Sequence, residues 1–344
     1  MDFSLFYFSS QVDDNGTCPY ELLWQGAKFA DENNFSAIWT PERHFDEFGA
    51  PFPSPVVTSA ALAMITKKIQ IRAGSVVLPL HNAVRVAEEW AMLDHFSNGR
   101  VGIAFASGWH ARDFSLSPYN YANRKKIMLE QLEMIKKLWR QEGISLVDGN
   151  GVETQVNTYP VPVNKNIPVW FAASGSEETF LTAADNNVGI LTHLFDQDLE
   201  SLAEKIRLYR NRLKSNDFKT GHVVLMLHTF VGDDLEYAKN SAKPHLKSYL
   251  ETAMKLESQQ QRYMKNTDNM SVSQEDLDVI LDYTIERFYK NKSLIGTVES
   301  CVPLVEKLKE IGVDEIACFI DFGIKHDIVM QNLSKLNSLK NRFF

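Results

Sequence analysis

Hydrophobic and polar positions follow a repeating order along the chain, in which a short apolar run precedes a longer stretch with a helical apolar period. The runs interpreted as strands are residues 3–8, 35–40, 69–78, 100–106, 167–173, 188–194, 222–232 and 314–323. The stretches interpreted as helices are residues 19–34, 54–66, 82–97, 123–142, a helix that opens at Ser176, 197–213 and 326–339. This order predicts one α/β domain over residues 1–344, a (β/α)8 TIM barrel, with a doubly wound open sheet as the alternative.

Two segments depart from this order. Residues 143–166 are rich in Gly, Pro and Asn and predict a surface hairpin. Residues 236–291, between the seventh and eighth strands, are mainly helical, but the middle part, residues 258–271, is polar and has no apolar period. In a barrel such an insertion lies over the carboxyl-terminal mouth, so we interpret it as a mobile lid. A surface loop without a role is the alternative.

Composition and charge narrow the function classes. The chain has 344 residues and a net charge of −8, which argues against a nucleic-acid partner. Its cysteines, Cys18, Cys301 and Cys318, are far apart, which favours a reducing compartment over a disulfide framework. The first residues lack the basic start of a signal peptide, and no apolar run has membrane-spanning length. We therefore expect a cytoplasmic protein with no membrane anchor.

Ionisable side chains follow several of the expected strands. Glu42, Arg43 and His44 come directly after the second strand and form a candidate acid/base cluster, with a buried structural ion pair as the alternative. Lone histidines at other strand ends, among them His81, His193 and His228, are weaker signals, because a lone His there is more often structural than catalytic. The acidic residues and histidines lack the short spacing of a zinc site, so no metal is expected.

Small residues follow three other strands, where a ligand could approach the backbone. They are Gly74-Ser75 after the third, Ser107-Gly108 before Trp109 after the fourth, and Ser174-Gly175-Ser176 after the fifth. The last group leads into a helix, whose amino-terminal N–H groups and dipole suit a phosphate, although Ser-x-x-Glu is also a capping-box pattern. H-E-x-x-H, G-x-S-x-G and P-loop motifs are absent. The pattern predicts a phosphorylated cofactor with a flat ring, without identifying it.

Longer motifs add a family resemblance. WTPERHFDEFG, FASGWHARDF, PVWFAASGSEETF, ILTHLF and GVDEIACFIDFG occur in this order, and the resemblance covers about residues 2 to 323. The chain resembles the bacterial-luciferase-like flavin monooxygenases, and more narrowly the branch found in polyketide and nonribosomal-peptide biosynthesis.

The resemblance implies the activity and its partners. Reduced FMN would lie across the barrel mouth, with O2 as co-substrate, and would support hydroxylation or a Baeyer–Villiger type of oxygen insertion. A separate flavin reductase would supply FMNH2, and related enzymes are often homodimers. An acyl or aminoacyl group on a carrier protein is the substrate that this branch suggests.

The resemblance also implies roles for individual residues, including a non-prolyl cis peptide at Gly74-Ser75. The residues expected around the flavin ring are Gly74, Ser75, Ser107, Gly108 and Trp109. Those expected at the phosphate are Arg124, Ser174, Gly175, Ser176 and Thr179. Those expected in oxygen activation or substrate polarisation are Glu42, Arg43, His44 and His193.

Two positions depart from the light-emitting luciferases. Arg43 stands where their catalytic His is found, which argues against light emission and leaves His44 as the nearest candidate for proton handling. Ser107 stands in place of their Arg and favours the biosynthetic branch. The competing hypotheses are an F420- or flavin-dependent hydride-transfer oxidoreductase and a non-catalytic flavin-binding partner subunit.

Overall fold

Eight parallel strands close into a barrel in the computed structural model, which describes residues 1–8, 18–49, 51–218, 221–265 and 274–344. In barrel order the strands are β1 (Asp2–Phe6), β2 (Ala37–Thr40), β3 (Gln70–Val77), β4 (Val101–Ala106), β7 (Val169–Ala173), β8 (Gly189–His193), β9 (Val223–Val231) and β11 (Glu315–Phe319). Pairing of β11 with β1 closes the ring. The predicted barrel is therefore confirmed, and the open doubly wound sheet is wrong.

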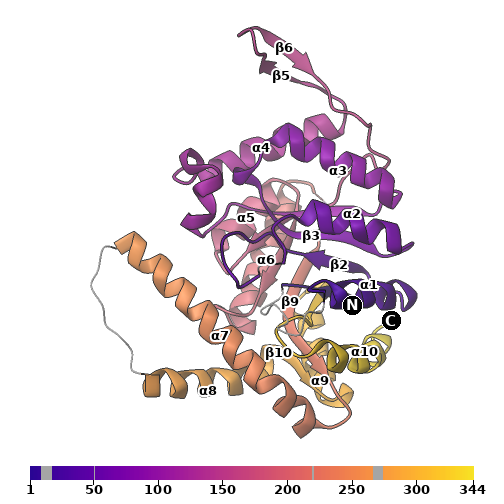
Figure 1. Cartoon of the computed structure of the whole chain (residues 1–344), viewed down its shortest axis with the longest axis vertical. Coiled ribbons are helices and arrows are strands. Elements are labelled where there is room, and N and C mark those ends of the chain that lie inside the picture. Colours follow the sequence, from indigo (N-terminus) through magenta and orange to yellow (C-terminus); the bar gives the residue numbers. More distant parts are fainter. Residues whose placement is uncertain (9–17, 50, 219–220, 266–273) are drawn as a thin grey trace.

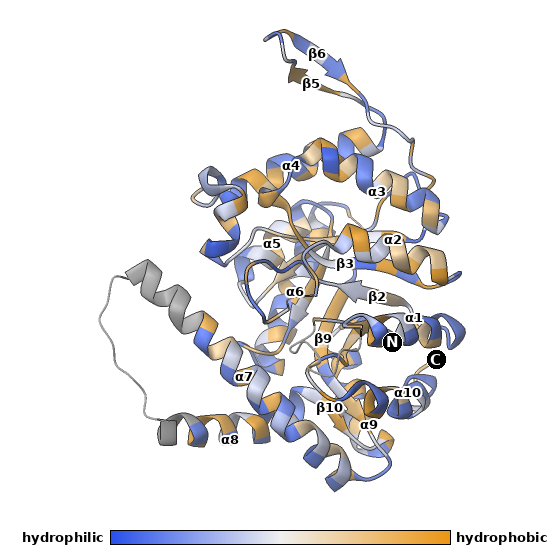
Figure 2. Ribbon diagram, in the orientation of Figure 1, coloured by the Kyte–Doolittle hydropathy of each residue, from blue (hydrophilic) through white to orange (hydrophobic). Residues whose placement is uncertain are grey.

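Helices cover the outside of the barrel, as the apolar periodicity predicts (Figure 1). They are α1 (Glu21–Glu32), α2 (Pro55–Ile65), α3 (Ala83–Ser97), α4 (Arg124–Trp139), α5 (Glu177–Asp185), α6 (Leu199–Ser215) and α10 (His326–Asn341). In Figure 2 the barrel strand β9 is mainly orange, whereas the helices carry both colours. This contrast is expected when a strand is covered on both faces and a helix on one.

Local sequence sets the ends of α3. The side chain of Asn82 accepts hydrogen bonds from the backbone N–H groups of Val84 and Arg85, at 2.9 and 3.3 Å, and so caps the first turn. At the other end Asn98 takes a left-handed conformation with φ of 56°, which Asn tolerates better than most residues, and Gly99 follows it. These caps confirm the predicted helix, and its stop places β4 in register with β3.

The two predicted excursions from the barrel are present. β5 (Ile144–Val147) and β6 (Glu153–Val156) form an antiparallel hairpin that projects from the barrel (Figure 1). α7 (Leu235–Lys265) and α8 (Gln274–Asn291) confirm the helical insertion, and ion pairs of Lys243 with Asp282 and of Lys247 with Asp278 join the two helices. The polar middle of the insertion lies partly in α7 and partly outside the described residues. Its action as a lid stays a prediction.

Between the insertion and β11 lies a unit that the sequence pattern left unassigned. β10 (Ser293–Gly296) is a further parallel strand, paired with the second half of β9 from His228 to Val231, and α9 (Val298–Glu310) follows it. All four residues of β10 are buried. A run of four residues is too short for period-based recognition, which explains why it was missed.

An ion pair fills the amino-terminal end of the barrel. The Arg72 guanidinium lies between the indole rings of Trp39 and Trp170, at 5.0 and 4.7 Å from their centroids, and Arg72 Nη1 donates to Glu315 Oε2 at 2.8 Å. Ser4 Oγ also donates to Glu315. Because the buried carboxylate has both a cation and hydrogen-bond donors, its charge is compensated. This end of the barrel is therefore filled, and ligand chemistry belongs at the other end.

Candidate functional site

Glu42 joins the carboxyl ends of β2 and β3. One of its carboxylate oxygens accepts from His44 Nε2 at 2.8 Å and from His81 Nε2 at 2.7 Å, and the other accepts from the Val77 N–H at 2.7 Å. The Glu42 side chain is fully buried. The structure thus brings together two residues of the predicted cluster and adds His81, which the sequence marked only as a weak signal.

The protonation states in this cluster follow from its geometry. Burial raises the pKa of Glu42, but the hydrogen bonds from His44, His81 and Val77 outweigh burial, so the pKa lies below its ordinary value. Burial lowers the pKa of His81, but the hydrogen bond and charge of Glu42 outweigh burial and raise it above its ordinary value. Glu42 is therefore an anion that orients two imidazoles, and it favours the protonated form of His81.

Arg43 is not part of this cluster. Its side chain turns away from Glu42, and its Nε donates to the Phe48 carbonyl at 3.4 Å. The guanidinium carbon lies 5.8 Å from the ring centroids of both Phe8 and Trp109. Within the part of the chain that the structure describes, buried Nη2 has no hydrogen-bond partner.

The expected cis peptide is present at Gly74-Ser75. A Cβ atom added to Gly74 would lie 2.9 Å from Phe6, 3.1 Å from Trp39 and 3.3 Å from a Leu191 methyl group, all inside the barrel. The barrel interior therefore leaves no room for a side chain at Gly74. Contact of Gly74 and Ser75 with a flavin ring stays a prediction.

Gly108 fixes the loop after β4. Its φ of 78° favours glycine, and an added Cβ would come within 2.7 Å of Phe114 and 2.8 Å of Val77. Arg124 Nε donates to the Gly108 carbonyl at 2.9 Å, so the first residue of α4 holds this loop. Trp109 follows with 46% of its surface exposed, and Ser107 precedes it at the end of β4. The loop thus presents Ser107 and Trp109 at the barrel mouth.

The start of α5 is open for an anion. Ser176 is the N-cap residue but makes no side-chain capping bond, so the capping-box alternative is not formed. Gly175 has φ of 117°, and Thr179 N donates to the Ser176 carbonyl. Ser174 precedes them directly after β7. Because no serine side chain satisfies the first-turn N–H groups, they suit a phosphate.

Two cations that the sequence analysis did not identify, Lys125 and Lys205, lie near this helix start. Lys125, next to Arg124, pairs with Glu178 of α5 at 2.6 Å and so brings the starts of α4 and α5 together. Lys205 of α6 reaches the loop, because a Cβ added to Gly175 would lie 3.7 Å from its Nζ. Lys205 Nζ also donates to Gln197 at 2.9 Å. No motif marks Lys205, which arrives from the next helix in the barrel.

Two histidines lie in neighbouring strands: His193 ends β8, whereas His228 lies within β9 and not at the strand end where the sequence analysis placed it. Burial lowers the pKa of His193, and Asp196 offsets this only in part. Burial also lowers the pKa of His228, to about 3, among the rings of Tyr249 and Phe319 at 4.6 and 4.8 Å. The Nδ1 of His193 accepts from the Phe195 N–H. Burial therefore disfavours the charged form of both imidazoles, and among the described residues the buried Nε2 of His228 has no hydrogen-bond partner.

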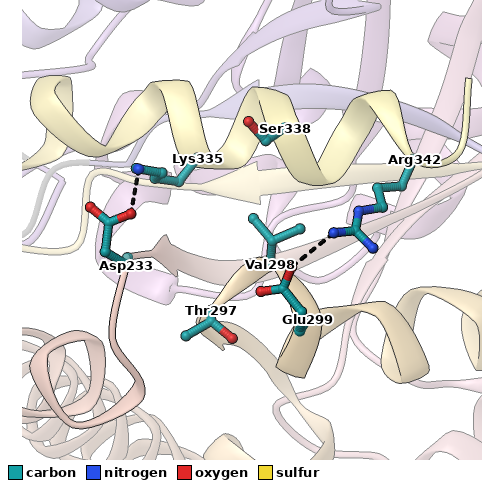
Figure 3. Close-up of a pocket in the computed structure, with 8 residues that line it drawn as sticks. Asp233, Thr297, Val298, Glu299, Lys335, Ser338 and Arg342 are labelled. Atoms are coloured by element: carbon teal, nitrogen blue, oxygen red, sulfur yellow. Dashed lines mark hydrogen bonds and ion pairs between the residues drawn. The ribbon is translucent and has the colours of Figure 1, made fainter.

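Other polar clusters lie away from the mouth. Among the described residues, Asp2, His222 and Glu315 meet the spacing of a metal site, but they lie at the amino ends of their strands, where Glu315 is paired with Arg72. A pocket of about 270 Å³ lies outside the barrel, at the start of α9 and along α10 (Figure 3). Ion pairs of Lys335 with Asp233 and of Arg342 with Glu299 cross it. These contacts already use its charged groups.

Within the described ranges, no helix combines the length and the apolar character that crossing a bilayer requires.

The residues at the mouth fit a flavin mononucleotide. The uncapped start of α5, with Gly175 and nearby Lys205, offers N–H groups and positive charge to a phosphate. Gly74 and Ser75, which lie within β3 and not after it, and the loop after β4 with Ser107, Gly108 and Trp109 present small residues and an indole, which suit a flat ring. The donor set thus matches both parts of this cofactor.

Comparisons with known proteins identify the family of the chain. Residues 1–315 match the family described as luciferase-like monooxygenase. The flavin-dependent trigonelline monooxygenase, oxygenase component, of Acinetobacter baylyi is 27% identical over 351 residues, which cover 98% of this chain and 93% of that protein.

Solved structures share the fold. Monooxygenase RslO1 from Streptomyces bottropensis superposes with a TM-score of 0.80 at 18% identity, covering 100% of this chain and 99% of that one. The oxygenating constituent of 3,6-diketocamphane monooxygenase from Pseudomonas putida, a type II Baeyer–Villiger monooxygenase in complex with FMN, gives 0.75 at 16% identity, covering 98% and 96%. With the match over residues 1–315, the chain belongs to the luciferase-like monooxygenase family.

Proposed function

We propose that this protein is the oxygenase component of a two-component, FMN-dependent monooxygenase that uses O2 and receives FMNH2 from a separate flavin reductase. The observation that carries the proposal is the uncapped start of α5, where Gly175 and Lys205 prepare a phosphate site at the mouth of a barrel of the monooxygenase family. The relative from Acinetobacter baylyi, named as an oxygenase component, supports the division into two proteins. Reduced FMN supplies the electrons that activate O2 for hydroxylation or Baeyer–Villiger oxygen insertion.

The chain's own residues would bind, orient and shield the cofactor. The phosphate would be held by the backbone of Ser174 to Ser176, by Thr179 and by the cations of Arg124 and Lys205. Gly74, Ser75, Ser107, Gly108 and Trp109 would surround the ring. The α7–α8 pair would exclude water from the mouth during reaction.

Proton handling falls to the imidazoles. His44 keeps a partly exposed side chain while Glu42 fixes its Nε2, so His44 is the group best placed to pass a proton at the mouth. His193, neutral because of burial, would donate or accept a hydrogen bond without carrying charge. Glu42 is a positioning residue, because both of its carboxylate oxygens already accept hydrogen bonds, one from His44 and His81 and the other from the Val77 N–H.

Finer parts of the proposal rest on the sequence. Ser107 supports a role in natural-product biosynthesis, with an acyl or aminoacyl group on a carrier protein as one substrate class, and Arg43 argues against light emission. The proposal also includes that the protein is a homodimer and acts in the cytoplasm.

The test measures cofactor choice first and oxygen chemistry second. The purified chain should bind FMN and FMNH2, and should consume O2 only when a reductase and NADH regenerate FMNH2. Thermal protection by F420 in place of FMN would support hydride transfer instead. Bound FMNH2 that reacts with O2 no faster than FMNH2 in solution would indicate the non-catalytic subunit.

A further inference from the structure

Arg43 is a buried cation that forms no ion pair with any of the described residues. The side chain is 6% exposed, and its Nη2 is buried without a hydrogen-bond partner within these residues. None of the ion pairs formed by described residues includes Arg43. A guanidinium keeps its charge at all ordinary pH values, and a buried charge without a partner is strongly unfavourable. This arrangement points to an anion that completes the site.

The surroundings of Arg43 are aromatic. Phe8, Phe48, Trp109 and Tyr249, here called the aromatic cage, come from four different parts of the barrel mouth. The rings of Phe8 and Phe48 lie 5.0 Å apart, and Phe48 and Tyr249 also lie 5.0 Å apart. Phe8 and Trp109 each have their ring centroid 5.8 Å from the guanidinium carbon. The cage thus offers flat apolar faces around one cation.

The polar groups nearest to Arg43 are already engaged or neutral. Glu42, its neighbour in sequence, accepts three hydrogen bonds from other groups. Asp46 accepts from the Phe48 N–H. Burial raises the pKa of Tyr249, so its phenol stays neutral although Arg43 acts against this. The cage therefore supplies no negative charge from these groups.

We propose that Arg43 determines substrate specificity by binding the carboxylate of a small planar aromatic acid whose ring packs against the aromatic cage. Planar guanidinium and carboxylate groups match in geometry, and aromatic faces favour a flat ring. Because Arg43 Nη2 is buried, the acid reaches it by displacing Trp109, whose 46% exposure exceeds that of Phe48 and Tyr249. The inference rests on the proposed monooxygenase function and favours a free acid over an acyl group on a carrier protein.

The experiment measures binding rather than turnover. The full chain, saturated with FMN, is titrated calorimetrically with benzoate, pyridine-3-carboxylate and benzamide, the last being a neutral match to benzoate. Benzoate should bind at least about 10-fold more tightly than benzamide. Arg43→Met should lower the affinity for benzoate by about 30-fold or more and leave the affinity for benzamide unchanged. Arg43→Lys should keep part of the affinity for benzoate that Arg43→Met loses.

A control variant separates charge at this site from charge elsewhere. Arg85→Gln removes an exposed arginine of α3 and should bind all three probes as the parent protein does. Circular dichroism and flavin fluorescence show whether each variant keeps its fold and its FMN. Equal affinity for benzoate and benzamide, unchanged benzoate affinity in Arg43→Met, or no saturable binding of either acid overturns the inference.

The remaining outcomes distinguish this inference from the proposed function. Loss of FMNH2 affinity in Arg43→Met with unchanged benzoate affinity would assign Arg43 to the flavin, which overturns the inference but keeps the monooxygenase proposal. Charge-dependent benzoate binding in a protein that binds neither FMN nor FMNH2 would overturn the function and support the carboxylate site.

Discussion

Glu42 organises the mouth of the barrel through three accepted hydrogen bonds that span β2 and β3. A buried carboxylate that loses its charge leaves several donors poorly satisfied. We therefore expect Glu42→Gln to lower the free energy of unfolding by about 1–3 kcal/mol, measured by urea denaturation. A stability equal to that of the parent protein would show that His44, His81 and Val77 find other acceptors.

The Glu42–His81 pair also predicts a pH dependence. The pKa of His81 is raised in the folded state, so its contribution to stability is complete below its unfolded value of about 6.5 and is lost as pH rises through the folded value. The pKa of Glu42 is lowered, so its contribution is present above its unfolded value of about 4.3 and is lost as pH falls through the folded value. In the His81→Asn variant, the urea midpoint should fall less steeply than in the parent protein as pH rises through the folded-state pKa of His81. An unchanged profile would contradict this prediction.

Gly108 allows a test with a matched control. Gly108→Ala combines φ of 78° with contacts of 2.7 and 2.8 Å, so we expect a loss of about 2–4 kcal/mol in unfolding free energy. Gly151→Ala has nearly the same φ, 79°, but nothing within 4 Å, and should cost about 1 kcal/mol. Equal losses, measured by urea denaturation, would mean that Phe114 and Val77 move aside without strain.

At the scale of elements, α5 and α6 act together, because the start of one and a lysine of the other meet at Gly175. Lys205→Met should weaken FMN binding by about 10-fold and leave riboflavin, which has no phosphate, unchanged. Flavin-fluorescence titration measures both. Lys214→Met, an exposed lysine of the same helix, is the control and should change neither affinity. A parallel loss for riboflavin would place Lys205 near the ring instead of the phosphate.

For the whole molecule, the three cysteines report on packing. Cys18 is exposed, whereas Cys301 and Cys318 are buried, and burial raises the pKa of Cys301 to about 12 and that of Cys318 further. The native protein should therefore show one thiol that reacts with Ellman's reagent, and guanidinium should release the other two. Two or more fast-reacting thiols in the native protein would show that the helices outside β9 and β11 open readily.

The fold was largely predictable from the sequence, because buried parallel strands read as apolar runs and Asn82 and Asn98 mark the ends of a helix. The four-residue strand β10 was not, since its pattern is too short. In the site, Glu42 and His44 were adjacent in sequence, but contact with His81 depends on the pairing of β2 with β3. The contact of Arg43 with Phe48 instead of the Glu42 cluster, and the position of Lys205 beside Gly175, depend on tertiary packing, which one sequence does not show.

The Arg72–Glu315 pair has a consequence for how this protein can diversify. With Ser4, Trp39 and Trp170, it ties five strands together at the end of the barrel away from the proposed substrate. Replacements at the cage around Arg43 leave these contacts intact. A combinatorial library at the mouth should therefore retain many folded members, and new substrate preferences can evolve there without rebuilding the scaffold.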